Sequence, residues 1–193
     1  RGYEMIGVDL SAEMLSVASE KARDLTGVIP PMFLQQPMEE LDLYGTIDAC
    51  VCCLDSVNYV TQPKALLRAF QRVHLFLMPG GLFLFDINTP EKLEGLDGGM
   101  FIDETDDTYC VWRADYARRS RICTYGFDLF FRQADGLWRR EEEVHEERAY
   151  APEELTELLR AAGFTHIQQY GDRKLRHPKP GEGRIFFAAR KEF

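Results

Sequence analysis

The sequence predicts a doubly wound α/β fold in which a mostly parallel sheet is interrupted by an antiparallel β insertion. Short apolar runs alternate with amphipathic helical patterns over about the first ninety residues, as in crossover units of a parallel sheet. From Tyr109 to Tyr150 the pattern changes to apolar-polar alternation, which is typical of antiparallel strands. We therefore expect a core segment over 1–96, an insertion over 97–150 that covers the substrate, and completion of the core by 151–193.

The first strand and helix meet near Asp9. Met5 to Val8 is a short apolar run that predicts a strand. Ser11 can cap the helix that follows, because its hydroxyl can accept a hydrogen bond from a free backbone N–H. The apolar face of that helix is expected to contain Met14, Ala18, Ala22 and Leu25.

The next elements contain the most apolar stretch of the chain. Met32 to Leu34 predicts a short strand, and Ile47 to Leu54 predicts a strand covered by helices on both faces. Pro63 can begin a helix, which we expect to end at Pro79-Gly80-Gly81, before a buried strand over Leu82 to Ile87. The buried face of that helix is expected to contain Leu66, Phe70, Val73 and Leu77.

The second half begins with the insertion, for which we expect two or three antiparallel strands and a turn at Ala134-Asp135-Gly136. A helix then opens at Pro152 and is stopped by Gly163. Two further strands are predicted, near Phe164 to Tyr170 and Arg184 to Ala189.

Composition narrows the class of protein. The 193 residues are 45% apolar, with a net charge of −9, so a nucleic-acid partner is not expected. The longest apolar runs fall far short of the ~18–20 residues that a membrane span requires. Cysteine occurs five times, an odd number, which favours a reducing, cytosolic location. Cys50, Cys52 and Cys53 lack zinc-ligand spacing, so we interpret them as small apolar strand residues and expect no metal site.

Polar residues follow three of the predicted strands, where open α/β sheets bind their ligands. Asp9 could accept both hydroxyls of a ribose, or it could cap the next helix. The cluster Leu54 to Tyr59 favours a binding site, because it holds more polar groups than a helix cap needs. The third cluster, Asp86 to Pro90, is explained equally well by a turn.

Several motifs together resemble class I S-adenosylmethionine-dependent methyltransferases, and most of all small bacterial ones of uncharacterised substrate. The resemblance covers essentially the whole chain and implies a Rossmann-like fold, S-adenosylmethionine as cofactor and a small-molecule methyl acceptor. The segments that carry it are Gly2 to Leu15, Leu41 to Ala49, Leu54 to Tyr59, Leu77 to Gly81, Glu147 to Tyr150 and Ala162 to Phe164.

The resemblance also implies which residues contact the cofactor. Asp9 would bind the ribose, Leu10 would pack on adenine, and Met38 falls at another adenine contact. Pro37 stands where the family often has an aspartate, so Gln36 or the backbone could supply adenine recognition. Cys53 and Leu54 match the strand end beside the methionine part. The expected cofactor-binding set is Asp9, Leu10, Ser11, Gln36, Met38, Cys53 and Leu54.

One family feature has no counterpart in the sequence, namely the first strand with its glycine-rich turn. The chain starts almost directly at a strand, so we expect it to begin partway through a domain. The absent strand would lie between those ending at Asp9 and Leu54, which leaves unpaired edges. The chain could be a fragment of a longer protein, or the two strands could pair directly or with another copy in a homodimer.

For the reaction, Asp55, Tyr59 and His145 are the predicted catalytic residues, and Asp86 and Tyr150 are further candidate bases. A solvated strand face would explain His145 as well. Two alternative functions stay open: a non-catalytic or truncated domain stabilised by dimerisation, and a nicotinamide-dependent oxidoreductase that uses Asp9 for its ribose. The motifs from Leu54 to Tyr59 and from Pro79 to Gly81 argue against the oxidoreductase.

Overall fold

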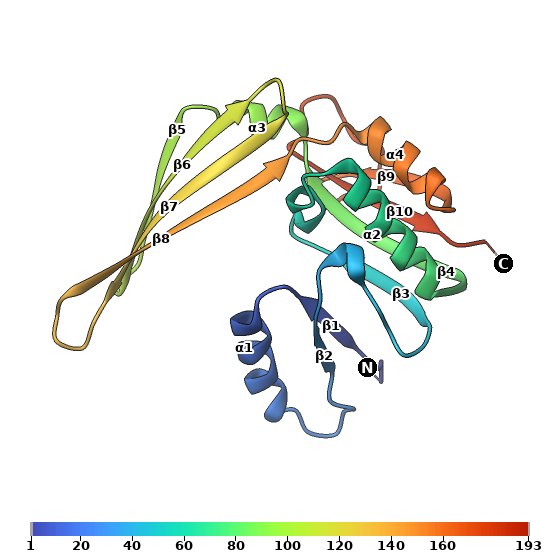
Figure 1. The fold of residues 1–193 in the computed structure, drawn as a ribbon, viewed down its shortest axis with the longest axis horizontal. Coiled ribbons are helices and arrows are strands. Elements are labelled where there is room, and N and C mark those ends of the chain that lie inside the picture. The colour runs from blue at the N-terminus through green and yellow to red at the C-terminus, as the bar shows by residue number, and fades with distance from the viewer. Residues whose placement is uncertain (1, 193) are drawn as a thin grey trace.

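The structure, a computed structural model that describes residues 2–192, has the predicted alternation of strands and helices (Figure 1). Its helices are α1 (Ala12–Arg23), α2 (Pro63–Phe76), α3 (Pro90–Gly95) and α4 (Pro152–Ala161), with 3-10 helices η1 (Met38–Glu40) and η2 (Ser56–Tyr59). The core strands are β1 (Ile6–Asp9), β2 (Met32–Gln35), β3 (Ile47–Cys52), β4 (Leu77–Asn88), β9 (Thr165–Gly171) and β10 (Arg184–Arg190). The insertion consists of β5 (Gly99–Glu104), β6 (Thr108–Ala117), β7 (Ile122–Arg132) and β8 (Trp138–Arg148).

These strands form three sheets within residues 2–192. β1 and β2 pair in parallel, β3-β4-β10-β9 form a mixed sheet, and β5-β6-β7-β8 form an antiparallel sheet. In the mixed sheet β3 and β4 are parallel, whereas β10 is antiparallel to both β4 and β9. The α/β class with an antiparallel insertion is therefore confirmed.

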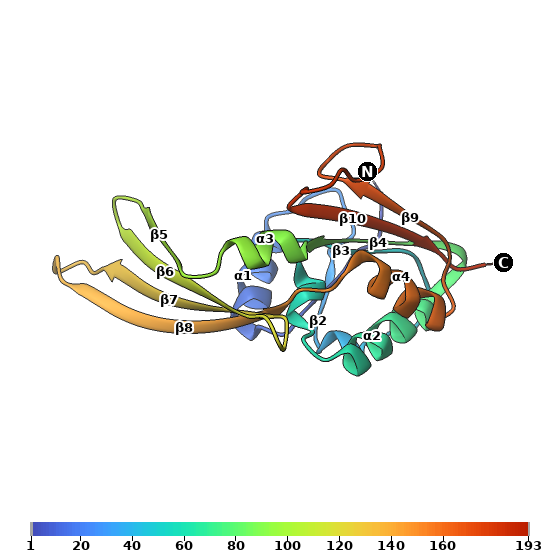
Figure 2. The ribbon, with the colours of Figure 1, turned by 90° about the horizontal axis from the view of Figure 1, so that it is seen from above.

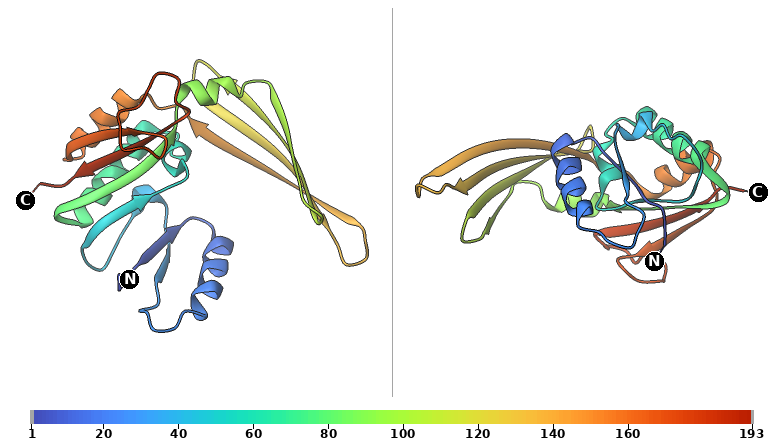
Figure 3. Two further views of the ribbon diagram at one scale, coloured as in Figure 1. Left: turned by 180° about the vertical axis from the view of Figure 1, so that it is seen from behind. Right: turned by 90° about the horizontal axis from the view of Figure 1, so that it is seen from below.

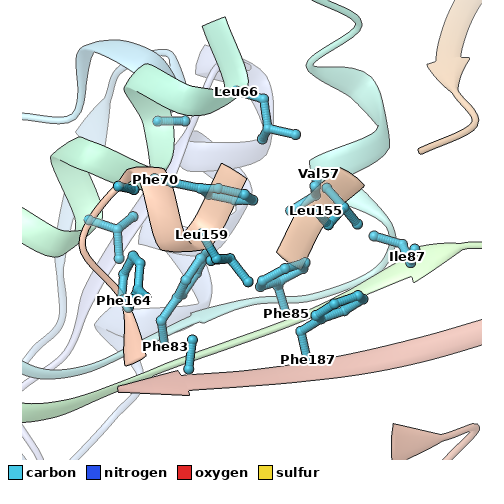
Figure 4. Packing of buried hydrophobic residues seen from close by; sticks show 14 of the residues in the cluster. Val57, Leu66, Phe70, Phe83, Phe85, Ile87, Leu155, Leu159, Phe164 and Phe187 are labelled. Carbon is cyan, nitrogen blue, oxygen red and sulfur yellow. The ribbon is translucent and has the colours of Figure 1, made fainter. Parts of the chain in front are cut away.

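The main core lies between the mixed sheet and the helices α2 and α4 (Figure 4). Phe85 of β4 stacks on Phe187 of β10 with ring centroids 4.8 Å apart, and Phe70 of α2 lies 5.5 Å from Phe85. Leu159 of α4 is fully buried in the same cluster. Burial of such side chains contributes about 1.5–3 kcal/mol each, so this cluster fixes the sheet that positions the strand ends.

Helices cover only one face of the mixed sheet in the described part of the chain (Figure 2). On the other face Val51 is 61% exposed. A cavity of about 430 Å³ lies on the same side, lined among others by Leu84, Tyr170 and Phe186. The expectation of helices on both faces of the strand Ile47–Cys52 was therefore wrong for residues 2–192, because an apolar run indicates two apolar faces but not what covers each of them.

The Pro79-Gly80-Gly81 segment belongs to strand β4 and does not end helix α2 as predicted. The helix ends earlier, at Phe76, where the Lys191 ammonium donates to the carbonyl oxygens of His74 and Leu77, each at 2.8 Å. A Cβ at Gly81 would lie 2.7 Å from the Met78 carbonyl oxygen, so this glycine permits a bulged strand. This contact comes from a lysine more than a hundred residues further along the chain, so local sequence does not reveal it.

The β1–β2 unit and α1 pack loosely, and direct pairing between the strands ending at Asp9 and near Leu54 does not occur. β1 pairs with β2 alone, and β3 lies in the other sheet (Figure 3). Helix α1 forms as predicted with Ser11 as its N-cap, but it buries no residue, and Met14 is 60% exposed. Its predicted apolar face packs only partly, against β1 and β2: Ala18 and Ala22 are half-buried, whereas Met14 and Leu25 are exposed.

The insertion projects from the core as a four-stranded sheet (Figure 1), not the two or three strands expected. Its turn at 133–137 falls where predicted. Strand β5 was missed because it is short and follows Gly98-Gly99, a pattern that indicates a loop. A second cluster of buried residues joins the insertion to α3; it contains Leu93, Ala114, Cys123, Tyr125 and Ala149.

Candidate active site at the strand ends

The carboxyl ends of β1, β3 and β4 point toward the side from which the insertion projects (Figure 1). The residues that follow these strands are those predicted as the site. The structure places Asp9 at the end of β1 with Leu10 after it, Cys53 to Tyr59 after β3, and Asn88 at the end of β4. His145 comes to the same region from β8, since its ring lies 5.9 Å from that of Tyr59.

Asp9 and Leu10 are suited to hold a nucleoside. Asp9 Oδ1 accepts the backbone N–H of Ser11 at 2.9 Å, while Oδ2 accepts no hydrogen bond from residues 2–192. The helix cap is Ser11, whose hydroxyl oxygen accepts the N–H of Met14 at 3.1 Å. Asp9 is therefore not needed as a cap, and its carboxylate can accept ribose hydroxyls. Leu10 is 65% exposed beside it, as an adenine-packing side chain must be.

Unlike Asp9 and Leu10, the two predicted adenine contacts Gln36 and Met38 are already engaged within the fold. Gln36 donates to the carbonyl oxygen of Asp42 at 3.1 Å and accepts its N–H at 2.7 Å. Both ends of this amide are therefore engaged, and Gln36 would have to exchange these partners to contact adenine. Met38 begins η1 and packs against the main core.

The loop after β3 is strained and is held by ionic groups. Leu54 and Asp55 both have left-handed backbone conformations, with φ of 59° and 52°. Neither Asp55 nor Ser56 caps η2: the Asp55 carboxylate accepts from Arg184 at 2.6 Å, and the Ser56 hydroxyl donates to the Cys53 carbonyl oxygen at 2.8 Å. A helix cap therefore does not explain these two polar side chains, and the binding site in this loop stays a prediction.

A buried polar network connects this loop to the insertion. Asn58 is fully buried; its amide donates to the carbonyl oxygens of Asn88 and Arg148 at 3.0 and 2.9 Å, and its oxygen accepts the N–H of Asn88 at 3.1 Å. Asn88 in turn donates to Glu147 at 2.8 Å. Burial raises the pKa of Glu147 to about 7, although the hydrogen bond from Asn88 opposes the shift. This network fixes the insertion against the end of β4.

Tyr59 and His145 form the more accessible part of the site. Tyr59 is 46% exposed. Burial of its hydroxyl, with the negative charges of Glu147 and Asp55, raises the pKa of Tyr59 to about 12, so the phenol is neutral and can donate near pH 7. His145 Nε2 lies 3.0 Å from a Glu143 carboxylate oxygen, and its ring meets Phe127 edge to face at 5.3 Å.

The two further candidate bases are engaged within the fold. The Tyr150 side chain is buried, with its hydroxyl donating to the Val60 carbonyl oxygen, and burial raises its pKa. Asp86 is 2% exposed and accepts from backbone N–H groups and Arg184. Neither Arg184 nor the role of Glu147 could be predicted from the sequence, because only the fold brings these residues together with their partners.

Known proteins match both the sequence and the fold. A family model described as a methyltransferase domain matches residues 1–81. A Bacillus subtilis (strain 168) protein provisionally named as the methyltransferase YqeM is 33% identical over 193 residues, covering 99% of this chain and 76% of that protein. The glycine/sarcosine N-methyltransferase of Halorhodospira halochloris is 22% identical over 200 residues, which are 100% of this chain and 69% of that protein.

A solved structure agrees closely with the fold. The crystal structure of an S-adenosylmethionine-dependent methyltransferase from Clostridium acetobutylicum ATCC 824 has a TM-score of 0.89 at 28% identity, covering 99% of this chain and 76% of that one. The 33% identity to the Bacillus subtilis protein and the match in fold to the Clostridium acetobutylicum structure both indicate a methyltransferase. The chain belongs to the class I S-adenosylmethionine-dependent methyltransferases, and S-adenosylmethionine is its cofactor. The oxidoreductase alternative is thereby set aside.

None of the helices in residues 2–192 is long and apolar enough to cross a membrane.

Proposed function

We propose that the protein transfers the methyl group of S-adenosylmethionine to an amine nitrogen of a small molecule. The observation that supports this most is the edge-to-face meeting of Tyr59 and His145 at 5.9 Å, beside the strand ends. The Glu143 carboxylate lies 3.0 Å from His145 Nε2. Aromatic rings and carboxylates both attract ammonium groups, so this combination favours an amine over a hydroxyl acceptor.

The same face of the insertion extends the aromatic surface away from the strand ends. Phe127 opposes Glu143 and Tyr125 opposes His145 across β7 and β8, so these side chains share one face. Trp112 continues the row, with its ring centroid 6.2 Å from Phe127. We propose that this face covers the bound methyl acceptor. Its aromatic side chains suit an amine that is attached to an apolar or cyclic group.

The relatives give independent support for a nitrogen acceptor. The Halorhodospira halochloris protein is named for the methylation of glycine and sarcosine, both of which are amines. Its identity to this chain is 22%, so we take from it the kind of accepting atom and not the substrate itself.

S-adenosylmethionine supplies a methyl group on a positively charged sulfur. An ammonium group has no lone pair, so an acceptor bound as ammonium first releases one proton to water. The lone pair of the neutral amine then forms the new N–C bond as the C–S bond breaks, and one further proton must leave the methylated nitrogen. When His145 donates its Nε2–H to Glu143, its Nδ1 keeps a lone pair that can take this proton. Tyr59 orients the acceptor through its neutral hydroxyl, and positioning supplies much of the rate enhancement.

This proposal is tested with isotope-labelled S-adenosylmethionine and a set of acceptors: an aliphatic, a cyclic and an aromatic amine, each beside its hydroxyl analogue. Mass spectrometry should find N-methylated products only. His145→Ala should lower kcat/KM by roughly 100-fold, the typical size of a lost general base. His177→Ala changes an exposed histidine of the 172–183 loop and should keep the wild-type rate. Methylated hydroxyl products, or a fully active His145→Ala enzyme, would contradict the proposal.

The alternative of a self-associating, non-catalytic domain is favoured by one observation. The apolar side chains Ile6, Val8 and Val51 of β1 and β3 are exposed, and the two strands do not pair with each other. Sedimentation over a wide concentration range tests it, because dimerisation there would raise the apparent mass with concentration while no methyl transfer occurs. The homodimer and the cytosolic location both stay predictions.

A further inference from the structure

The loop after β3 adopts a conformation that its own residues disfavour. Leu54 and Asp55 both lie in the left-handed region, with φ of 59° and 52°. Aspartate visits this region more readily than most residues, but leucine rarely does, because its Cβ crowds the backbone. Two such residues in succession persist only where the surroundings hold them.

The first group that holds this turn is the Asp86 carboxylate. Asp86 Oδ1 accepts the N–H of Leu54 at 2.8 Å, and Oδ2 accepts the N–H of Asp55 at 3.3 Å. The left-handed turn directs both N–H groups to the same side, where one carboxylate satisfies them. Asp86 is 2% exposed, and a buried carboxylate is costly unless a positive group compensates it.

Arg184 provides that positive group from β10, which pairs with β4 on the edge opposite to β3. It opposes Asn88 in the β10–β4 register. Its Nη1 donates to Asp86 Oδ2, and its Nη2 donates to Asp55 Oδ1 at 2.6 Å and to Asn88 Oδ1 at 3.2 Å. One planar guanidinium thus joins the carboxylate that binds the turn to the carboxylate on the turn, a geometry that a single ammonium cannot reproduce.

We propose that Arg184 is a positioning residue for methyl transfer, which holds the left-handed Leu54–Asp55 turn against Asp86 and so fixes the strand end at the cofactor site. In this assignment Asp55 is a partner of Arg184 and not a free base. The inference rests on the proposed placement of the cofactor beside Cys53 and Leu54.

The test compares Arg184→Met and Arg184→Lys with the wild-type protein in two measurements. Calorimetric titration with S-adenosylhomocysteine should show roughly tenfold weaker binding in Arg184→Met and a smaller loss in Arg184→Lys, whose ammonium can hold one carboxylate. Amide hydrogen exchange by NMR should be faster at Leu54 and Asp55 in Arg184→Met, with exchange at the core residue Phe85 unchanged. Arg184→Lys also keeps the test decisive if Arg184→Met does not fold.

Arg176→Met is the matched control. Arg176 pairs with Glu182 in the neighbouring loop, so its loss should leave both S-adenosylhomocysteine affinity and exchange at Leu54 unchanged. Weaker binding without faster exchange, or faster exchange with wild-type binding, would each overturn the positioning role. If the wild-type protein itself binds no S-adenosylhomocysteine, the proposed cofactor placement fails, whereas the exchange measurement still reports whether Arg184 holds the turn.

Discussion

Asn58→Ala should lower the free energy of unfolding by about 3–6 kcal/mol, since it leaves three backbone groups without partners, two of them buried and one half-buried. These groups are the carbonyl oxygens of Asn88 and Arg148 and the N–H of Asn88. The Asn58 side chain is fully buried, and both of its bonds to Asn88 are buried as well, so water cannot readily replace them. Urea denaturation followed by circular dichroism measures the change.

Ser56→Ala on the same 3-10 helix is the control for Asn58. The Ser56 hydroxyl makes one exposed hydrogen bond, to the Cys53 carbonyl oxygen, so its removal should cost less than about 1 kcal/mol. If Asn58→Ala is also destabilised by less than about 1 kcal/mol, the network does not join the insertion to the core as described. A typical domain has only ~5–15 kcal/mol of stability, so Asn58→Ala could be unfolded without urea, which would also agree with the prediction.

In the Glu147→Gln variant, the free energy of unfolding should fall less with rising pH than it does in the wild-type protein. Burial raises the pKa of Glu147 from 4.5 to about 7. A carboxyl with a raised pKa in the folded state stabilises the protein fully below its unfolded pKa, and this contribution is lost as pH rises through the folded value. Glutamine cannot ionise and avoids the loss. Between pH 5 and pH 8, the unfolding free energy of Glu147→Gln relative to wild type should therefore rise by roughly 2–3 kcal/mol.

Denaturation of both proteins at the two pH values measures this difference, and Glu146→Gln is the matched control. Glu146 is the adjacent, exposed residue of β8, so its replacement should alter stability by less than about 0.5 kcal/mol at either pH. A Glu147→Gln advantage that is the same at pH 5 and pH 8 would show that Glu147 is already ionised at pH 5 in the folded protein.

Local sequence patterns were sufficient to predict most elements of the fold. Pro63 and Ser11 lie at helix starts, and Gly163 follows the end of α4, with φ of +102°. The strand ends could be located because apolar runs stop at Asp9 and near Leu54. These signals lie within a few residues of the feature that they predict, so they can be recognised without knowledge of the tertiary structure.

The parts that were missed depend on contacts between distant residues. Arg184 meets Asp55 across 129 positions of the chain, and no spacing rule connects them. At the boundary between α2 and β4, Lys191 contacts the chain from more than a hundred residues away. Whether helices cover one face of the mixed sheet or both likewise depends on distant segments of the chain. The candidate site was therefore predictable as a set of strand ends, but its ionic and buried hydrogen bonds were not.

A cofactor site at the end of β1 is central to the proposed methyl transfer, and calorimetric titration of S-adenosylhomocysteine tests for it most directly. The wild-type protein should bind at micromolar strength. Asp9→Ala should bind at least tenfold more weakly, because a hydrogen bond to a charged group contributes about 1.5–3 kcal/mol. Asp24→Ala, which removes an exposed carboxylate from the end of α1, should bind like wild type. Equal affinity of the Asp9→Ala and wild-type proteins would contradict the placement of the cofactor.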